Sequence, residues 1–143
     1  MKGDPQVMEA LQEHLTRELT TVDQFSQHAF RHEHQGRAAL AQSIEAAAVR
    51  STTHVRTLSF RILDLEGMPN AQRRHPLRQG ETLEEMLQND LAFELQVRDG
   101  LNEGIGIAGT RGDWTSQRML QDFFIAREPH VFFLERQLDQ LRS

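Results

Sequence analysis

The sequence predicts an all-α protein, an antiparallel four-helix bundle, and three observations predict it. Apolar residues recur at steps of three and four along four separate stretches, which is the period of an amphipathic helix. No stretch alternates apolar and polar residues with a period of two, so no sheet is expected. The stretches are joined mostly by short links, which favour antiparallel neighbours. The 143 residues suit one domain, and residues 1–143 are assigned to a single bundle.

The first two helices carry recognisable end signals. Asp4 followed by Pro5 is typical of a helix start, because the carboxylate caps free N–H groups and proline suits the first helical position. The second helix is expected to end at Gly67, with Pro69 just beyond it. The apolar positions of these helices are Val7, Leu11, Leu15, Val22 and Phe25, then Leu40, Ile44, Ala47, Leu58, Ile62 and Leu65.

A long connection and two further helices complete the bundle. Residues 67–80 contain two prolines and predict a crossover between the second and third helices. Thr82 and Glu85 form a capping-box pattern at the start of the third helix, and Gly112 with Asp113 separates that helix from the fourth. The apolar positions here are Leu83, Leu87, Leu91, Val97, Leu101, Ile105 and Ala108, then Leu120, Phe123, Leu134, Leu138 and Leu141.

Composition excludes several classes of function. The formal net charge is −5 and no basic block stands out, so nucleic acid is not expected as a partner. No apolar run approaches the roughly 20 residues that span a bilayer, and no signal peptide is recognisable, so we expect a cytoplasmic protein without membrane contact. The absence of cysteine excludes disulfides, thiolate zinc sites and a cysteine nucleophile.

Polar residues interrupt each apolar stripe near its middle. Because a charged side chain on a core face is costly unless it is paired or bound to metal, their similar heights predict a polar chamber inside the bundle. Carboxylate-bridged di-iron sites have this layout, with one glutamate from each of two helices and a Glu-x-x-His pair from each of the other two. The interrupting residues are Glu18, Ser51, His54, Glu94, Arg127 and His130.

The two Glu-x-x-His pairs lack their carboxylates, since Ser51 and Arg127 stand in those places. The preferred interpretation is that Arg127 replaces metal and pairs with Glu18, Glu94 or both. A single iron or zinc ion held by two glutamates and two histidines is an alternative, because these metals suit two nitrogen and two oxygen ligands. That set is Glu18, His54, Glu94 and His130. A polar network that serves packing alone is the third interpretation.

The chain resembles the bacterioferritins along essentially its whole length. The resemblance rests on several blocks in register: Met1-Lys2-Gly3-Asp4, Glu18-Leu19-Thr20, Leu65-Glu66-Gly67-Met68-Pro69-Asn70, Gly80-Glu81, Glu84-Glu85-Met86-Leu87, Asp90-Leu91-Ala92 and Glu94-Leu95. It implies a ferritin-like fold in a hollow 24-subunit cage that oxidises ferrous iron and stores ferric mineral. It also implies di-iron ligands at positions 18, 51, 54, 94, 127 and 130, and a haem held between paired subunits by methionines.

The sequence departs from this family pattern at other places as well. The haem methionine would stand at position 52, which is Thr52, so no haem is expected. Ala46 and Arg50 stand where the resemblance implies iron-binding residues facing the cavity. A short fifth helix is expected to be reduced or missing. By resemblance, three residues would lie near pores between subunits, namely His34, Glu66 and Asp139.

These observations predict a subunit of an iron-storage cage that lacks its own ferroxidase and haem sites. It would act as a structural or accessory subunit in a homo- or hetero-oligomer, beside a catalytic bacterioferritin subunit. One alternative is a ferritin-like protein with a residual mononuclear site and ferroxidase-type activity. Another is a smaller, non-storage binding protein on the same bundle. No cofactor is expected in the preferred interpretation, and one iron or zinc ion in the first alternative.

Overall fold

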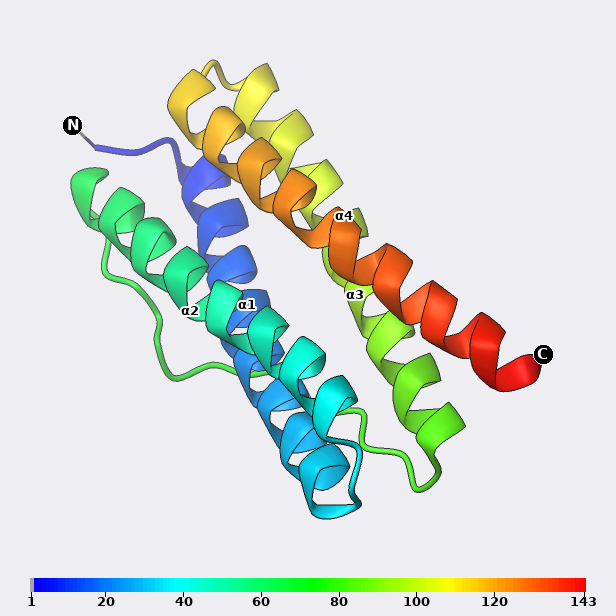
Figure 1. Cartoon of the computed structure of the whole chain (residues 1–143). Coiled ribbons are helices and arrows are strands. Elements are labelled where there is room, and N and C mark those ends of the chain that lie inside the picture. The colour runs from blue at the N-terminus through cyan, green and yellow to red at the C-terminus, as the bar shows by residue number, and fades with distance from the viewer. Residues whose placement is uncertain (1) are drawn as a thin grey trace.

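The computed structural model of the protein describes residues 2–143 and folds into four α-helices. The helices are α1 (Pro5–His34), α2 (Ala38–Asp64), α3 (Leu83–Thr110) and α4 (Trp114–Arg142). Helices α1 and α2 form one antiparallel pair and α3 and α4 the other, α1 and α3 join the two pairs, and the backbones of α2 and α4 come close at few places (Figure 1). Within residues 2–143 there is no strand and no fifth helix. The predicted four-helix bundle with a long crossover is confirmed.

The predicted capping signals form as hydrogen bonds. Asp4 Oδ1 accepts from the backbone N–H groups of Gln6 at 2.9 Å and Val7 at 3.2 Å. At the start of α3, Thr82 Oγ1 accepts from the N–H of Glu85 at 3.1 Å, and Glu85 Oε2 accepts from the N–H of Thr82 at 3.2 Å. Each bond satisfies an N–H group that the helix itself leaves free, which fixes where the helix begins.

Helix α2 ends slightly earlier than the sequence predicts. Its last residue is Asp64, and Glu66, not Gly67, adopts the left-handed conformation with φ of 65°. The N–H of Gly67 donates to the carbonyl of Ile62 at 2.9 Å and closes the helix end. Gly67 leaves room for the side chain of Met8, since a Cβ atom at position 67 would lie 2.9 Å from the sulfur of Met8.

The crossover between α2 and α3 is fastened along α1 by side chains of α1. Thr20 Oγ1 accepts from the N–H of His75 at 2.9 Å. The amide of Gln24 makes two bonds to the backbone of Arg78, donating to its carbonyl at 2.7 Å and accepting from its N–H at 2.9 Å. Because these bonds satisfy crossover backbone groups that no helix or sheet partners, the segment lies in a defined path and α3 returns beside α1.

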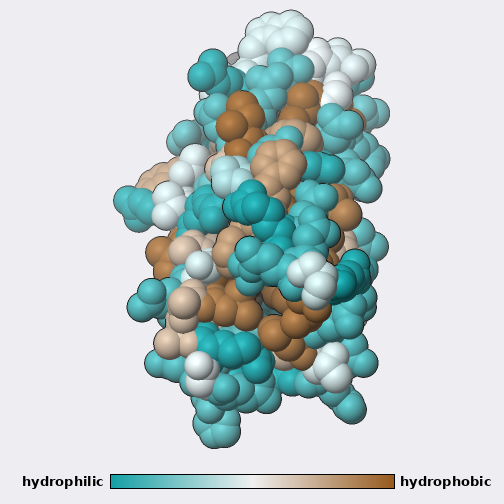
Figure 2. Space-filling model, turned by 45° about the vertical axis from the view of Figure 1, so that its right-hand side comes forward, coloured by the Kyte–Doolittle hydropathy of each residue, from teal (hydrophilic) through white to brown (hydrophobic). Residues whose placement is uncertain are grey.

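The core is mainly apolar but buries polar side chains at its centre and around His28 and Asp90, and the surface carries several exposed apolar side chains. Figure 2 shows apolar groups on one face, separated by polar side chains. None of the helices combines the length and the apolar character needed to cross a membrane. The large exposed apolar residues are Phe30, Val49, Phe60, Leu63, Met68, Trp114, Ile125, Phe132 and Leu141.

Candidate functional site

The polar residues that interrupt the four stripes are all buried at the centre of the bundle. The relative exposure of Glu18 is 0%, that of Glu94 1% and that of Arg127 3%. The remaining three, Ser51, His54 and His130, are buried as well. Each helix therefore contributes a polar side chain to one chamber, as the sequence predicts.

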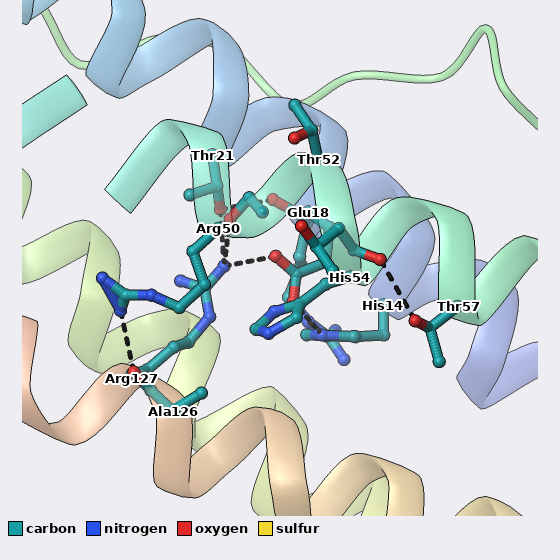
Figure 3. Close-up of polar contacts among 12 residues, drawn as sticks. His14, Glu18, Thr21, Arg50, Thr52, His54, Thr57, Ala126 and Arg127 are labelled. Carbon is teal, nitrogen blue, oxygen red and sulfur yellow. Dashed lines mark hydrogen bonds and ion pairs between the residues drawn. The ribbon is translucent and has the colours of Figure 1, made fainter. Parts of the chain in front are cut away.

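Arg127 lies at the middle of this chamber and binds residues of the other three helices. Its Nη2 atom donates to Glu18 Oε1 at 2.8 Å and to Thr21 Oγ1 at 2.8 Å (Figure 3). Its Nη1 atom donates to Glu94 Oε1. Ser51 Oγ lies 3.5 Å from Nη2. One guanidinium thus bridges the two carboxylates. The sequence left open whether Arg127 pairs with Glu18, with Glu94 or with both, and in the structure it pairs with both.

The second oxygen of Glu18 is occupied by two histidines. His14 Nε2 lies 2.7 Å and His54 Nδ1 3.1 Å from Glu18 Oε2 (Figure 3). Since an ionised carboxylate only accepts, both ring nitrogens must carry hydrogen. Phe123 stacks on both rings, with centroids 5.6 Å from His14 and 4.3 Å from His54. The nitrogen of His54 that faces the cluster is therefore a donor.

Glu94 has fewer partners than Glu18. Its Oε2 atom lies 3.5 Å from His130 Nδ1, which is a long contact. Among the described residues, the ring nitrogens of His130 have no closer hydrogen-bond partner, and the ring packs edge-on against Phe25 with centroids 4.9 Å apart. Arg127 is thus the main partner of the Glu94 carboxylate.

The charges of this cluster stabilise one another. Burial alone would raise the pKa of Glu18, but Arg127 and His14 hold that pKa well below its usual range. The pKa of Glu94 is lowered in the same way, with Arg127 and then His130 outweighing burial. Burial opposes the charge on Arg127, yet the two glutamates raise its pKa. Two carboxylates and one guanidinium are therefore ionised together at neutral pH.

The cluster is nearly filled by its own side chains. The cavity beside Arg127 and Ser51 has a volume of about 10 Å³, at the lower limit for one water molecule. Within residues 2–143, no three His, Cys, Asp or Glu side chains are arranged to hold a metal ion. Two of the four residues named for the mononuclear alternative, Glu18 and Glu94, are bound by Arg127, and that alternative stays a prediction.

Two residues of the cluster, His14 and Thr21, were not identified from the sequence. His14 carries a signal that could have revealed it, since it precedes Glu18 by four residues and so shares its helix face. Thr21 carries a similar signal, since it follows Glu18 by three residues on the same helix. Arg50 Nη1 donates to the carbonyl of Ala126 at 2.8 Å, which ties α2 to α4 beside the cluster (Figure 3).

The other residues implied by the resemblance lie away from this cluster. Thr52 is exposed on α2 and its hydroxyl donates to the carbonyl of Val49. His34, Glu66 and Asp139 are exposed near helix ends, on α1, after α2 and on α4 respectively. Their assignment to pores between subunits stays a prediction, because it concerns contacts with other chains.

Comparisons with a family model and with individual known proteins indicate the same family. A family model described as the ferritin-like domain matches residues 8–143. A bacterioferritin of Streptomyces coelicolor is 39% identical over 143 residues, which covers 100% of this chain and 86% of that protein. Bacterioferritin BfrA of Mycobacterium tuberculosis is 37% identical over 139 residues, covering 97% of this chain and 87% of the relative. The chain belongs to the bacterioferritin family.

The residues of this bacterioferritin do not fit the di-iron centre that its family implies. Such a centre uses four carboxylates and two histidines from the four helices. Here two carboxylates remain, both are bound by Arg127, and His54 directs a proton toward the cluster. The site as built is an ion-pair cluster, not a set of free ligands.

Proposed function

We propose that this bacterioferritin is a structural or accessory subunit of an iron-storage cage and does not oxidise iron at its own bundle centre. The observation that carries the proposal is the position of Arg127, whose guanidinium joins Glu18 to Glu94 where the family places metal. A catalytic bacterioferritin subunit in the same cage would supply the oxidation.

Electrostatics support this proposal. Two ferrous ions bring four positive charges, and the family site balances them with four carboxylates. Here Glu18 and Glu94 are the only carboxylates at the six ligand positions, and Arg127 already neutralises one of their two charges. A divalent cation would have to displace a buried guanidinium that makes several hydrogen bonds, and Arg127 would then be buried without a partner, which is strongly unfavourable.

Assembly is supported by the surface of the single chain. Large apolar side chains such as Phe30, Phe60 and Ile125 are more than half exposed. Exposed apolar groups of this size are typical of surfaces that other chains cover. With the family's cage as the expected assembly, we assign these residues to contacts between subunits.

Haem binding is not part of the proposed function. The position that would supply the axial methionine is Thr52, and its hydroxyl is occupied by the carbonyl of Val49. A threonine hydroxyl does not replace a thioether as a ligand of haem iron. We therefore expect the purified protein to lack the absorption bands of haem.

Stopped-flow absorbance tests the proposal directly. Ferrous iron and oxygen are mixed with the purified protein, with an intact bacterioferritin at the same subunit concentration, and with a cage assembled from both. The protein alone is expected to oxidise iron no faster than buffer, and the mixed cage in proportion to its catalytic subunits. Oxidation by the pure protein at the rate of the intact relative would overturn the proposal.

Native mass spectrometry provides the second measurement. Material purified from its own cells is expected to contain this chain together with a second bacterioferritin chain in one large assembly. A dimer of this chain alone would contradict the cage and favour the smaller binding protein. Metal analysis of the same sample should give no iron or zinc bound in a fixed ratio to this chain.

A further inference from the structure

His14 is a buried histidine that lies outside the family's six ligand positions. Its relative exposure is 0%, and it lies on α1 one turn before Glu18. Its Nε2 atom is closer to Glu18 Oε2, at 2.7 Å, than His54 Nδ1 is, at 3.1 Å. The shortest contact on that oxygen therefore comes from a residue outside those six positions.

The proton positions on His14 are fixed by its two neighbours. The Nε atom of Arg17 is only a donor and lies 3.2 Å from His14 Nδ1, so Nδ1 must accept. The ring hydrogen then resides on Nε2 and points at Glu18. If Nε2 were to give up this hydrogen to bind a cation, Nδ1–H would face the N–H of Arg17, and two donors would oppose each other.

The guanidinium of Arg17 lies close to the backbone of α3 at Gly100. A Cβ atom at Gly100 would lie 2.6 Å from Arg17 Cζ, so the guanidinium occupies the space that any other residue would fill. Arg17 and Gly100 line a groove of about 470 Å³ between α1 and α3. A continuous series of contacts thus runs from this groove through Arg17 and His14 to the carboxylate of Glu18.

From this series of contacts we infer that His14 is a positioning residue that holds Glu18 away from metal, independently of Arg127. The inference rests on the proposed function, because it concerns the same closed centre. Arg127 occupies Oε1 of Glu18 and His14 occupies Oε2. Removing Arg127 frees one oxygen only, and Glu18 keeps the orientation that its hydrogen bond to His14 gives it.

The test restores the missing carboxylates and asks whether His14 still opposes metal. The double variant Ser51→Glu with Arg127→Glu is compared with the triple variant that adds His14→Leu. Cobalt(II) binding is measured by calorimetry and by the visible absorption of the bound ion. Because a hydrogen bond to a buried charge is involved, the triple variant should bind cobalt about 10- to 100-fold more tightly than the double variant. His32→Leu in the double variant is the matched control, since His32 is also buried on α1 and does not contact the cluster.

Equal affinity in the double and triple variants, or weaker binding after His14→Leu, would overturn the inference. A second measurement uses the wild-type protein, so it does not depend on the folding of variants with added carboxylates. In wild-type protein with ¹⁵N-labelled histidine, the ring nitrogens of His14, assigned by their loss in His14→Gln, should show the neutral form with hydrogen on Nε2. Hydrogen on Nδ1 would contradict the inference. Iron oxidation by the wild-type protein would instead refute the proposed function, so the two failures are distinguishable.

Discussion

Replacing Arg127 by methionine tests the buried ion cluster most directly. Methionine retains much of the length and apolar volume of the side chain but removes the guanidinium. Glu18 would keep its contacts with His14 and His54, at 2.7 Å and 3.1 Å. Glu94 would keep only the 3.5 Å contact with His130. The variant therefore contains a nearly unpartnered carboxylate in a site that is almost fully buried.

The expected loss of stability is large. Removing one partner of a buried ion pair costs about 3–5 kcal/mol, because the remaining charge stays buried. In a chain of this size, 1 kcal/mol corresponds to roughly 2–4 °C in the unfolding temperature, so the midpoint should fall by about 10 °C. The loss should shrink on mild acidification. Without Arg127, burial raises the pKa of Glu94 in the folded variant above its value in the unfolded chain. The protonated Glu94 then favours the folded state below the unfolded pKa, and this contribution to stability is lost as the pH rises through the raised pKa.

Urea and thermal unfolding at pH 8 and pH 5 measure both effects. Arg118→Met is the matched control, because Arg118 lies on the same helix in an exposed pair with Asp122 and should change stability by less than about 1 kcal/mol. If the Arg127→Met and Arg118→Met variants were equally stable at pH 8, Arg127 would not be the group that stabilises the two buried glutamates, and the reasoning would fail.

Three further predictions concern neighbouring features. Burial lowers the pKa of His14 from 6.5 to about 4. As the pH falls, the His14 ring therefore takes up a proton in the unfolded chain before it does so in the folded protein. The free energy of unfolding should fall by about 3 kcal/mol between pH 6.5 and pH 4 for this reason. In His14→Gln this part of the pH dependence of urea unfolding should vanish. Gly106→Ala should stabilise α3 by up to about 1 kcal/mol, because nothing lies within 4 Å of the added Cβ, whereas Gly100→Ala should destabilise by displacing Arg17. Equal unfolding midpoints for the two alanine variants would contradict this. Thr82→Ala should cost about 1 kcal/mol through loss of the capping box, and an unchanged urea midpoint would show that the cap contributes nothing.

The sequence was sufficient for the architecture because the signals of helices are local. The cap at Asp4 and the capping box at Thr82 involve residues two or three positions apart, and both form as predicted. The path of the crossover was not predictable in the same way. It depends on bonds such as Gln24 to Arg78, whose partners are 54 residues apart and carry no mutual pattern in the sequence.

The site was predictable in its position but not in its hydrogen bonding. Buried polar residues stand out on an apolar stripe, so the sequence alone could place Glu18, Glu94 and Arg127 together. Which oxygens Arg127 binds depends on side-chain direction, which the sequence does not encode locally. His14 was not identified, and its role depends on Arg17, whose guanidinium lies beside the backbone of another helix.

The two substitutions in the Glu-x-x-His pairs are physically coupled. With a glutamate at position 51, three buried carboxylates would face one guanidinium, and the excess charge would be costly. With a carboxylate at position 127 and serine at 51, three carboxylates would be buried with no cation at all unless metal were bound. The combination of Ser51 and Arg127 leaves two carboxylates bridged by one guanidinium, and Ser51 is small enough to leave room for the arginine. On the proposed function, the guanidinium of Arg127 supplies the positive charge at this centre that metal supplies in a di-iron bundle. The guanidinium of Arg127, on α4, contacts residues of the other three helices and so links all four at the centre of the apolar core.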